Sequence, residues 1–287
     1  MKFKEFRKKN VGLLLILPWW IGFAIFKLYP FISSLIYSFH DYNLFRTATF
    51  SGLSNYKKIL GDPLIMKAFI QTFKYAFLTV PLELIFALFI AYILNFKIKG
   101  VNFFRTAYYI PSILGGSVSI AVLWRFLFKT EGLVNMIASR FGIQPFNWLG
   151  DPGGAFWVIV FLKIWQFGSP MVIFLAALKG VSQDLYEAAS IDGAGRMRIL
   201  WTILVPSIKP AVVVVGMMLF IQIWNDLLQQ IIYINSMSKF TFAIALTNFT
   251  GSFGTNWPVA LAATFMTILP GIVIYIFGQK SFVEGIV

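Results

Sequence analysis

The sequence predicts an all-α membrane protein with six transmembrane helices and a cytoplasmic hairpin between the fourth and fifth helices. Hydrophobic residues make up 59% of the chain and charged residues only 12%, whereas charged residues are about a quarter of a typical soluble domain. Several apolar stretches are long enough to cross a bilayer, which takes roughly 20 residues of helix. Because barrel strands are only about 10 alternating residues long, runs of this length favour a helical bundle.

Six segments have the length and composition of membrane spans. They are residues 11–39, 69–94, 106–128, 154–178, 207–234 and 258–278. The first follows the basic start "MKFKEFRKKN", which is similar to a signal peptide. Its apolar run exceeds the usual 7 to 15 residues of such a peptide, so we expect a retained helix. The loops are too short for a separate domain, and residues 1–287 are expected to form a single transmembrane domain.

Prolines and glycines inside these segments predict irregular or closely packed helices. The prolines expected to break or kink their helices are Pro81, Pro111, Pro170 and Pro270. Such irregular backbone is tolerated in a membrane where it faces protein or a watery cavity. The glycines expected to let neighbouring helices approach closely are Gly115, Gly116 and Gly216. Small residues serve this purpose because packing drives helix association in lipid.

The charge distribution places both chain ends in the cytoplasm. Outside the predicted spans, Lys and Arg are concentrated in the N-terminal segment and around residues 97–105 and 179–209, and cytoplasmic loops prefer basic residues. The net charge of +13 follows from the same preference, so we expect no nucleic-acid partner. The longer loops, 40–68, 129–153 and 235–257, are then extracellular.

Residues 182–206, "SQDLYEAASIDGAGRMRILWTILVP", are unusually charged for a segment between two apolar runs. Ser182 can cap a helix whose first turn contains Asp184 and Glu187. Carboxylates are favourable at that end because they meet the positive end of the helix dipole. The segment is therefore expected to begin with a short helix at the cytoplasmic surface.

The second half of this hairpin is expected to turn back into the fifth span. Gly193 and Gly195 suit a left-handed helix end, because glycine lacks the Cβ that penalises positive φ. A second short helix is expected to run until Pro206, and Pro210 fits the first turn of the fifth span. On physical grounds alone, an ordinary interfacial hairpin, held at the lipid headgroups by its arginines, fits this pattern equally well.

The hairpin resembles the cytoplasmic signature of bacterial ABC importer permeases. That signature is Glu-Ala-Ala, three residues, Gly, nine residues and Ile-x-Leu-Pro. The residues that match it here are Glu187, Ala188, Ala189, Gly193, Ile203 and Pro206. The one departure is Val205 in place of leucine, a change of apolar shape. Several fixed positions over twenty residues make this a specific motif.

Most of the chain is similar to the carbohydrate branch of that family, as in maltose-type and glycerol-phosphate-type importers. The stretches that carry the similarity are "LYPFISSLIYSFHDYN", "FFRTAYYIPSI", "IWQFGSPMVIFLAAL" and "YEAASIDGAG". The resemblance implies a permease subunit of the bacterial inner or plasma membrane that forms half of a pore for a sugar or oligosaccharide, by alternating access. It does not reveal which sugar.

The resemblance also implies the partners. A second permease subunit would complete the pore, two cytosolic ATPase subunits would bind ATP and Mg, and an extracellular solute-binding protein would dock on the outer loops, for which 235–257 is the preferred candidate. The hairpin would be the coupling helix. Its implied ATPase-coupling residues are Asp184, Leu185, Tyr186, Glu187, Ala188, Ala189, Asp192 and Gly193.

Two polar clusters in the spans are candidates for the substrate pathway, because sugar recognition needs hydrogen-bonding groups beside aromatic faces. The candidate residues are Trp165, Gln166 and Phe167 in the fourth span, and Gln222, Trp224, Asn225 and Asp226 in the fifth. Amides also hydrogen-bond between helices in lipid. Packing between helices is therefore an open alternative for both clusters.

Ionisable residues within the spans admit two explanations as well. Glu83 could line a pathway, but we favour a structural role in which it satisfies backbone freed by Pro81 or pairs with Lys74. The long basic side chains of Lys27, Arg125 and Lys163 are expected to reach toward the membrane interfaces.

Other function classes fit the sequence less well. An ion-coupled secondary carrier is the main alternative and would use Glu83 and Asp226, but such carriers usually contain internal repeats, and none is evident here. An enzyme is not expected, because the chain has a single histidine, no cysteine and no phosphate-binding loop. ATP would therefore have to be hydrolysed by another chain.

Overall fold

The computed structural model describes residues 11–43, 46–96, 99–234, 236–247, 250–251 and 254–284, and most of them are helical. Three helices are long and apolar enough to cross a membrane: Leu15–Ser38, Pro63–Asn95 and Trp257–Ser281. Three bent helix pairs raise the number of candidate spans to six. The predicted helical membrane protein is confirmed at this level. Contacts group the chain into two compact units.

The first unit contains residues 1–62 and 246–266. Its described helices before residue 62 are α2 (Val11–Phe23), the π-helical turn η1 (Ala24–Leu28), α3 (Tyr29–Ser38) and α4 (Ser54–Gly61). The two short hairpins are β1 (His40–Asn43) with β2 (Arg46–Phe50), and β3 (Thr250–Gly251) with β4 (Gly254–Thr255). The first predicted span is thus one helical run interrupted only by η1.

Buried Asn55 joins α4 to the end of α3 in this unit. Its amide Nδ2 donates hydrogen bonds of 2.9 Å to the carbonyls of Ser38 and His40. These carbonyls lie at the point where the chain leaves the helix and enters the antiparallel pair β1–β2, in which His40 faces Phe50. A helix end leaves such groups without intrahelical partners, and Asn55 supplies one.

The second unit contains residues 63–245 and 267–287. Its helices up to the hairpin are α5 (Pro63–Asn95), α6 (Val101–Leu114), α7 (Val118–Leu127), α8 (Leu133–Arg140), α9 (Pro152–Trp165) and α10 (Gly168–Lys179). The following elements are α11 (Gln183–Ile191), α12 (Arg196–Ile199), the π-helical turn η2 (Leu200–Leu204), α13 (Val205–Ser207), α14 (Lys209–Trp224), α15 (Leu228–Tyr233) and the turn η3 (Met237–Lys239). Two helices cross the boundary between the units, α16 (Phe242–Thr247) and α17 (Trp257–Glu284).

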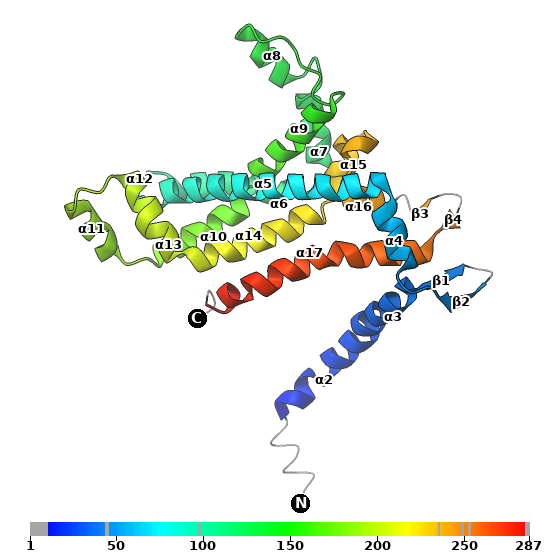
Figure 1. The fold of residues 1–287 in the computed structure, drawn as a ribbon. Helices are drawn as coiled ribbons and strands as arrows, with labels where there is room; N and C mark the ends of the chain where they lie inside the picture. The colour runs from blue at the N-terminus through cyan, green and yellow to red at the C-terminus, as the bar shows by residue number, and fades with distance from the viewer. Residues whose placement is uncertain are drawn as a thin grey trace, which may run out of the picture. The chain divides into compact units, whose positions relative to one another are not determined.

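Helix α5 is the element around which the second unit is organised. It packs against α10 and α14, and α10 packs in turn against α6 (Figure 1). Two apolar clusters form the core: one beside the hairpin, which includes Tyr92, Phe174 and Leu200, and one around Trp224. Both clusters contain residues of α5, so this helix connects the two ends of the unit.

The third predicted span is not a single straight helix. Residues 106–128 divide into α6 and α7, which meet at an angle of 102°. Gly115 and Gly116 interrupt the helix, and the Ser117 side chain then caps α7 by accepting a hydrogen bond from the Ile120 amide. The fourth span, 154–178, is also bent, by 40° between α9 and α10.

The fifth predicted span, residues 207–234, is longer than the helix observed there. The helix α14 ends at Trp224 rather than continuing to residue 234, and the chain then forms the separate short helix α15. At its start, α14 meets the helical segment Arg196–Ser207 at an angle of 79°. Pro210 lies in the first turn of α14, as predicted.

Most prolines expected to interrupt helices do not end them. Helices α5, α6 and α17 continue through Pro81, Pro111 and Pro270, and Pro170 lies near the start of α10. A proline removes one hydrogen bond, which a helix packed against neighbours can tolerate. Two of the three bends have a proline in the first turn of the helix that follows, Pro170 in α10 and Pro210 in α14.

Gly168 tests the close packing of α10 on α6. A Cβ at this position would lie 2.4 Å from the Tyr108 carbonyl oxygen, whereas one at Gly271 in α17 would meet nothing within 4 Å. We expect Gly168→Ala to destabilise the protein by about 1–3 kcal/mol through overpacking. The control Gly271→Ala should be neutral or stabilising by up to about 1 kcal/mol. Thermal unfolding in detergent measures both, and equal melting temperatures would contradict the packing.

Candidate functional site

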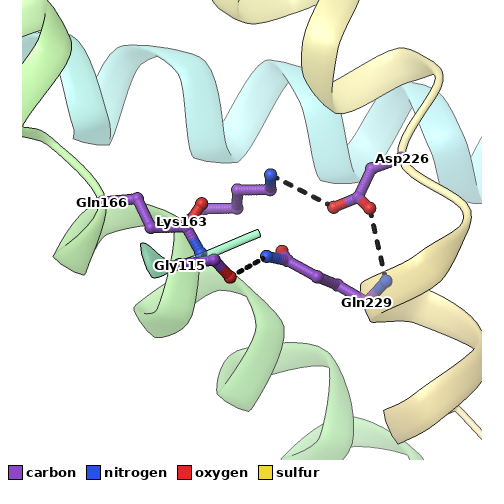
Figure 2. A network of polar contacts seen from close by, with 5 residues as sticks. All are labelled: Gly115, Lys163, Gln166, Asp226 and Gln229. Carbon is purple, nitrogen blue, oxygen red and sulfur yellow. Dashed lines mark hydrogen bonds and ion pairs between the residues drawn. The ribbon is translucent and has the colours of Figure 1, made fainter. Parts of the chain in front are cut away.

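Three helix breaks in the second unit meet at the carbonyl of Gly115. This carbonyl lies between α6 and α7, where the helix no longer supplies its usual partner. It accepts a hydrogen bond of 3.1 Å from Gln166 Nε2, at the break between α9 and α10, and one of 3.0 Å from Gln229 Nε2, in α15 (Figure 2). The three broken spans are therefore joined at one acceptor.

Glycine is required at the centre of this junction. A Cβ on residue 115 would lie 2.4 Å from Gln166 Cγ, which is far inside van der Waals contact. The predicted close approach is confirmed for Gly115. It is wrong for Gly116, where a Cβ would meet nothing within 4 Å.

Ser112 satisfies the break between α9 and α10 from the opposite side. Its hydroxyl donates to the Gln166 carbonyl at 2.6 Å and accepts from the Ser169 amide at 2.8 Å. Both backbone groups lie where the fourth span bends. Because Gly168 allows α6 to approach at this point, one serine side chain replaces the missing helical hydrogen bonds.

An ion pair lies beside the junction. Lys163 Nζ of α9 is 3.3 Å from Asp226 Oδ2, in the segment after α14, and the two side chains are 15% and 9% exposed (Figure 2). The other carboxylate oxygen of Asp226 accepts a hydrogen bond of 3.4 Å from the Gln229 amide. The expectation that Lys163 reaches toward the interface is therefore wrong, because an oppositely charged side chain holds it within the protein.

Glu83 lies in the interior near the same lysine. Its side chain is 3% exposed, and the charge of Lys163 acts on it. Within the described part of the chain, Glu83 Oε2 has no hydrogen-bond partner and no ion pair with Lys74 is found. The expected Lys74 pair is therefore not observed.

The predicted pathway residues have different environments. Trp224 is a core residue, with its indole N–H donating to the Thr267 carbonyl at 2.9 Å and its ring stacked on Phe220. Phe167 is also buried, packed edge-on against Phe86. These two aromatic residues support the fold rather than presenting a free face.

The remaining pathway candidates are more accessible. Trp165 is half-buried with its ring 5.7 Å from that of Trp124, while Gln222 and Asn225 are exposed on the last turn of α14 and just after it. The structure thus brings Gln166 and Asp226 together at the junction but not Gln222. Sequence reasoning missed Lys163 and Gln229 as members of this site.

The hairpin begins as its sequence predicts. Ser182 caps α11 and its hydroxyl accepts from the Asp184 amide at 3.3 Å. Gly193 has a left-handed φ of 74° and ends the helix. Gly195 differs from the prediction: its φ of −65° is ordinary, and it instead precedes the first turn of α12. The second helix also continues, through η2 and α13, beyond Pro206 to Ser207.

The hairpin has an inner and an outer face. Ala189 is buried in the apolar cluster beside α5, and Tyr186 is half-buried. The exposed members of the predicted coupling set are Asp184, Leu185, Glu187, Ala188, Asp192 and Gly193. A groove of about 870 Å³ lies between the hairpin and the end of α5, and its lining includes Lys179, Glu187 and Arg196.

Among the residues that the structure describes, no group of three or more His, Cys, Asp or Glu side chains is placed to hold a metal ion.

Residues 65–280 match the model of a family described as "Binding-protein-dependent transport system inner membrane component". The chain is 42% identical over 214 residues to the Bacillus subtilis protein described as "Probable ABC transporter permease protein YesP", covering 74% of this chain and 69% of that protein. It is 34% identical to the trehalose/maltose transport system permease protein MalF of Thermococcus litoralis, covering 73% and 72%. It is also 32% identical to the sn-glycerol-3-phosphate permease protein UgpA of Escherichia coli, covering 71% and 70%.

Among solved structures, the fold is similar to a chain of a bacterial ABC transporter involved in the import of alginate. The TM-score is 0.81, with 21% sequence identity and coverage of 98% of both chains. A chain of a bacterial alginate ABC transporter in complex with an alginate pentasaccharide-bound periplasmic protein gives a TM-score of 0.80 at 20% identity, covering 98% of this chain and 96% of that chain. At this identity the likeness concerns the fold.

The ion pair can be tested by removing each partner in turn. Lys163→Met leaves the Asp226 carboxylate without its cation, and breaking a buried pair in this way costs about 3–5 kcal/mol. Asp226→Leu should cost less, because the side chain of Lys163 is the more exposed of the two and its long stem can carry the charge toward water. The double variant should be more stable than the sum of the two losses predicts. Thermal unfolding in detergent provides the three values, and strict additivity would show that the pair contributes nothing.

Proposed function

Because the chain belongs to the family of binding-protein-dependent transport system inner membrane components, we propose that it forms half of the pathway by which an ABC importer carries a sugar or oligosaccharide across the membrane. The other half would come from a second permease subunit. Two cytosolic ATPase subunits would bind ATP and Mg and supply the energy. An extracellular solute-binding protein would deliver the sugar.

The family resemblance seen in the sequence is confirmed, and the chain is a transport subunit rather than an enzyme. The alternative of an ion-coupled secondary carrier is not favoured, because the relatives named above are permease components of multi-subunit transport systems. The intramembrane ion pair therefore needs an explanation other than ion coupling.

The observation that carries the sugar assignment is the set of relatives. Those named for their substrates transport trehalose and maltose, arabinooligosaccharides or sn-glycerol-3-phosphate. Each is a polyhydroxylated solute or its phosphate. We therefore assign this chain a substrate of the same chemical class, with hydroxyl groups as its main recognition feature.

The hairpin α11–α12 is our candidate coupling helix. Its helix α11 is short and capped, and it presents exposed Leu185 and Ala188 beside the charged Asp184 and Glu187. A small residue such as Ala188 lets a partner approach the backbone closely, while Leu185 offers an apolar anchor. These features suit a helix that docks in a groove of an ATPase subunit.

The substrate pathway is proposed to pass beside the Gly115 junction. Gln166 and Asp226 lie at this junction. Gln222 in the last turn of α14 and Asn225 just after it are exposed. Where backbone is irregular and polar within spans, a water-filled path or a partner usually lies beside it. The second permease subunit would supply the opposite wall.

Both chain termini and the hairpin are proposed to lie in the cytoplasm of a bacterial cell. The basic residues at positions 1–10 that support this orientation lie outside the described residues. The preferred docking loop for the solute-binding protein, 235–257, is described only in part. The similar alginate transporter was solved with a periplasmic protein, which supports a comparable docking here.

The proposed coupling helix is tested by reversing the charge of Glu187. Glu187→Lys should leave membrane insertion intact, because the side chain is exposed, but it should reduce co-purification of the ATPase subunits about tenfold or more, as expected when a close charge pair worth ~1.4 kcal/mol or more becomes repulsive.

The matched control is Glu131→Lys, which reverses an exposed charge on the predicted outer loop. This control should retain the ATPase subunits. Normal retention of the ATPase subunits and normal sugar uptake by Glu187→Lys would count against the assignment of α11 as the docking helix.

A further inference from the structure

Two side-chain hydrogen bonds fasten the hairpin to the end of α5. Tyr92 Oη donates to the Arg196 carbonyl at 2.9 Å, and Asn95 Nδ2 donates to Tyr186 Oη at 3.2 Å. Arg196 begins α12 and Tyr186 lies within α11. Each helix of the hairpin is therefore held by one residue from the last turns of α5, although the paired residues are far apart in the sequence.

The apolar contacts at this point cannot fix the hairpin by themselves. Ala189 and Ile199 are buried in the same cluster as Tyr92, but apolar burial has no directional preference. Two smooth apolar surfaces can slide with little change in buried area. Hydrogen bonds require a particular distance and angle, so the bonds of Tyr92 and Asn95 favour one position of the hairpin along α5.

Two arginines reinforce the end of α5. The Arg196 guanidinium lies 5.3 Å from the centre of the Phe96 ring, a favourable cation–π distance. Arg105 Nη2 donates to the Leu94 carbonyl at 3.0 Å, which satisfies a carbonyl in the last helical turn. The end of α5 is thus fixed as well as the hairpin that it holds.

The rest of the hairpin is open. The groove of about 870 Å³ separates part of α11 from α5, Ile191 is 86% exposed, and Glu187 is exposed. Force applied to the outer face of α11 can pass to α5 through the buried apolar residues and through the two hydrogen bonds. Among the residues described, these two are the side-chain hydrogen bonds that join α5 directly to the hairpin.

Helix α5 is suited to carry such a force onward. It is one helix of 33 residues, whereas the neighbouring candidate spans α6–α7, α9–α10 and α12–α14 are bent at breaks. It carries Tyr92 at the hairpin, and further along it packs against α9, the helix that contains Lys163. A displacement of its end therefore reaches the polar junction without passing a hinge.

We propose that Tyr92 and Asn95 are positioning residues that lock the hairpin to α5, so that movement of the docked ATPases shifts α5 and with it the polar junction. This inference rests on the proposed function, because it takes the hairpin as the ATPase docking site. It adds a specific mechanical link that the docking assignment alone does not require.

The chain itself offers a rescue variant for this link. Burial raises the pKa of Tyr186 above its ordinary value, with a smaller contribution from Tyr92, so its hydroxyl keeps its proton. In Asn95→Asp the Tyr186 hydroxyl can donate to the new carboxylate, which restores the bond in the opposite sense. Asn95→Leu has a similar size and cannot form it.

The test uses the assembled complex and spin labels, for which the absence of cysteine from the chain is convenient. One label pair, at Ile191 and Phe89, reports the spacing of the hairpin and α5. A second pair, at Phe89 and Phe126, reports movement of α5 relative to α7. All three side chains are at least 42% exposed, so the labels should not disturb the core.

In the native sequence we expect the Ile191–Phe89 label pair to give a narrow distance distribution that ATP with vanadate does not change. The distance between the labels at Phe89 and Phe126 should change when ATP with vanadate is added. In the double variant Tyr92→Phe/Asn95→Leu, the distance distribution of the first label pair should broaden. The nucleotide-dependent change of the second pair should fall about fivefold or more, because the equilibrium contribution of a hydrogen bond is of this order. Replacing Leu by Asp at position 95 should recover part of the response. The control Tyr109→Phe, at a 39% exposed residue of α6, should behave as native.

Two results would overturn the link. One is that the distance distribution of the first label pair does not change in the double variant. The other is that a variant which retains its ATPase subunits still shows the native response of the second pair to nucleotide. ATPase content is measured separately on every sample. If the native complex does not retain ATPase subunits, that result would contradict the proposed function instead. The first label pair needs no nucleotide, so it would still decide whether the two hydrogen bonds hold the hairpin.

Discussion

The carbonyl of Gly115 is the acceptor on which the arrangement of the broken helices depends. Each break exposes backbone groups that water would satisfy at a protein surface but that lipid cannot. Gln166 and Gln229 both donate to this one carbonyl, and Ser112 satisfies two groups at the neighbouring bend. The bends between α6 and α7 and between α9 and α10 are thus each completed by side chains from other spans.

The polar core around this carbonyl combines rigidity with a capacity for rearrangement. Hydrogen bonds between helices in a membrane contribute modestly, about 0.6 kcal/mol each on average. A junction built from several such bonds can hold one arrangement and still exchange partners when a helix shifts. The Lys163–Asp226 pair lies beside these hydrogen bonds and connects α9 to the segment after α14.

Sequence patterns predicted the local features well because those features depend on neighbouring residues. The long apolar runs, the Ser182 cap and the turn at Gly193 were found as expected. The errors concern contacts between distant segments. Nothing near Lys163 in the sequence indicates Asp226 as its partner, and the break after Trp224 is stabilised by groups from other spans. Pro81, Pro111 and Pro270 lie inside continuous helices, whereas Pro170 follows a break in the fourth span.

The two sites lie at different parts of the second unit, and α5 contacts both. In the mechanism proposed above, the hairpin receives force, α5 transmits it and the broken spans respond. The direct test of the central claim is a cysteine at the exposed Leu185 of this cysteine-free chain. We expect a membrane-impermeant reagent to reach it only in inverted vesicles, and a short cross-linker to join it to an ATPase subunit. Labelling from the outer side, or a complete complex without that cross-link, would contradict the account.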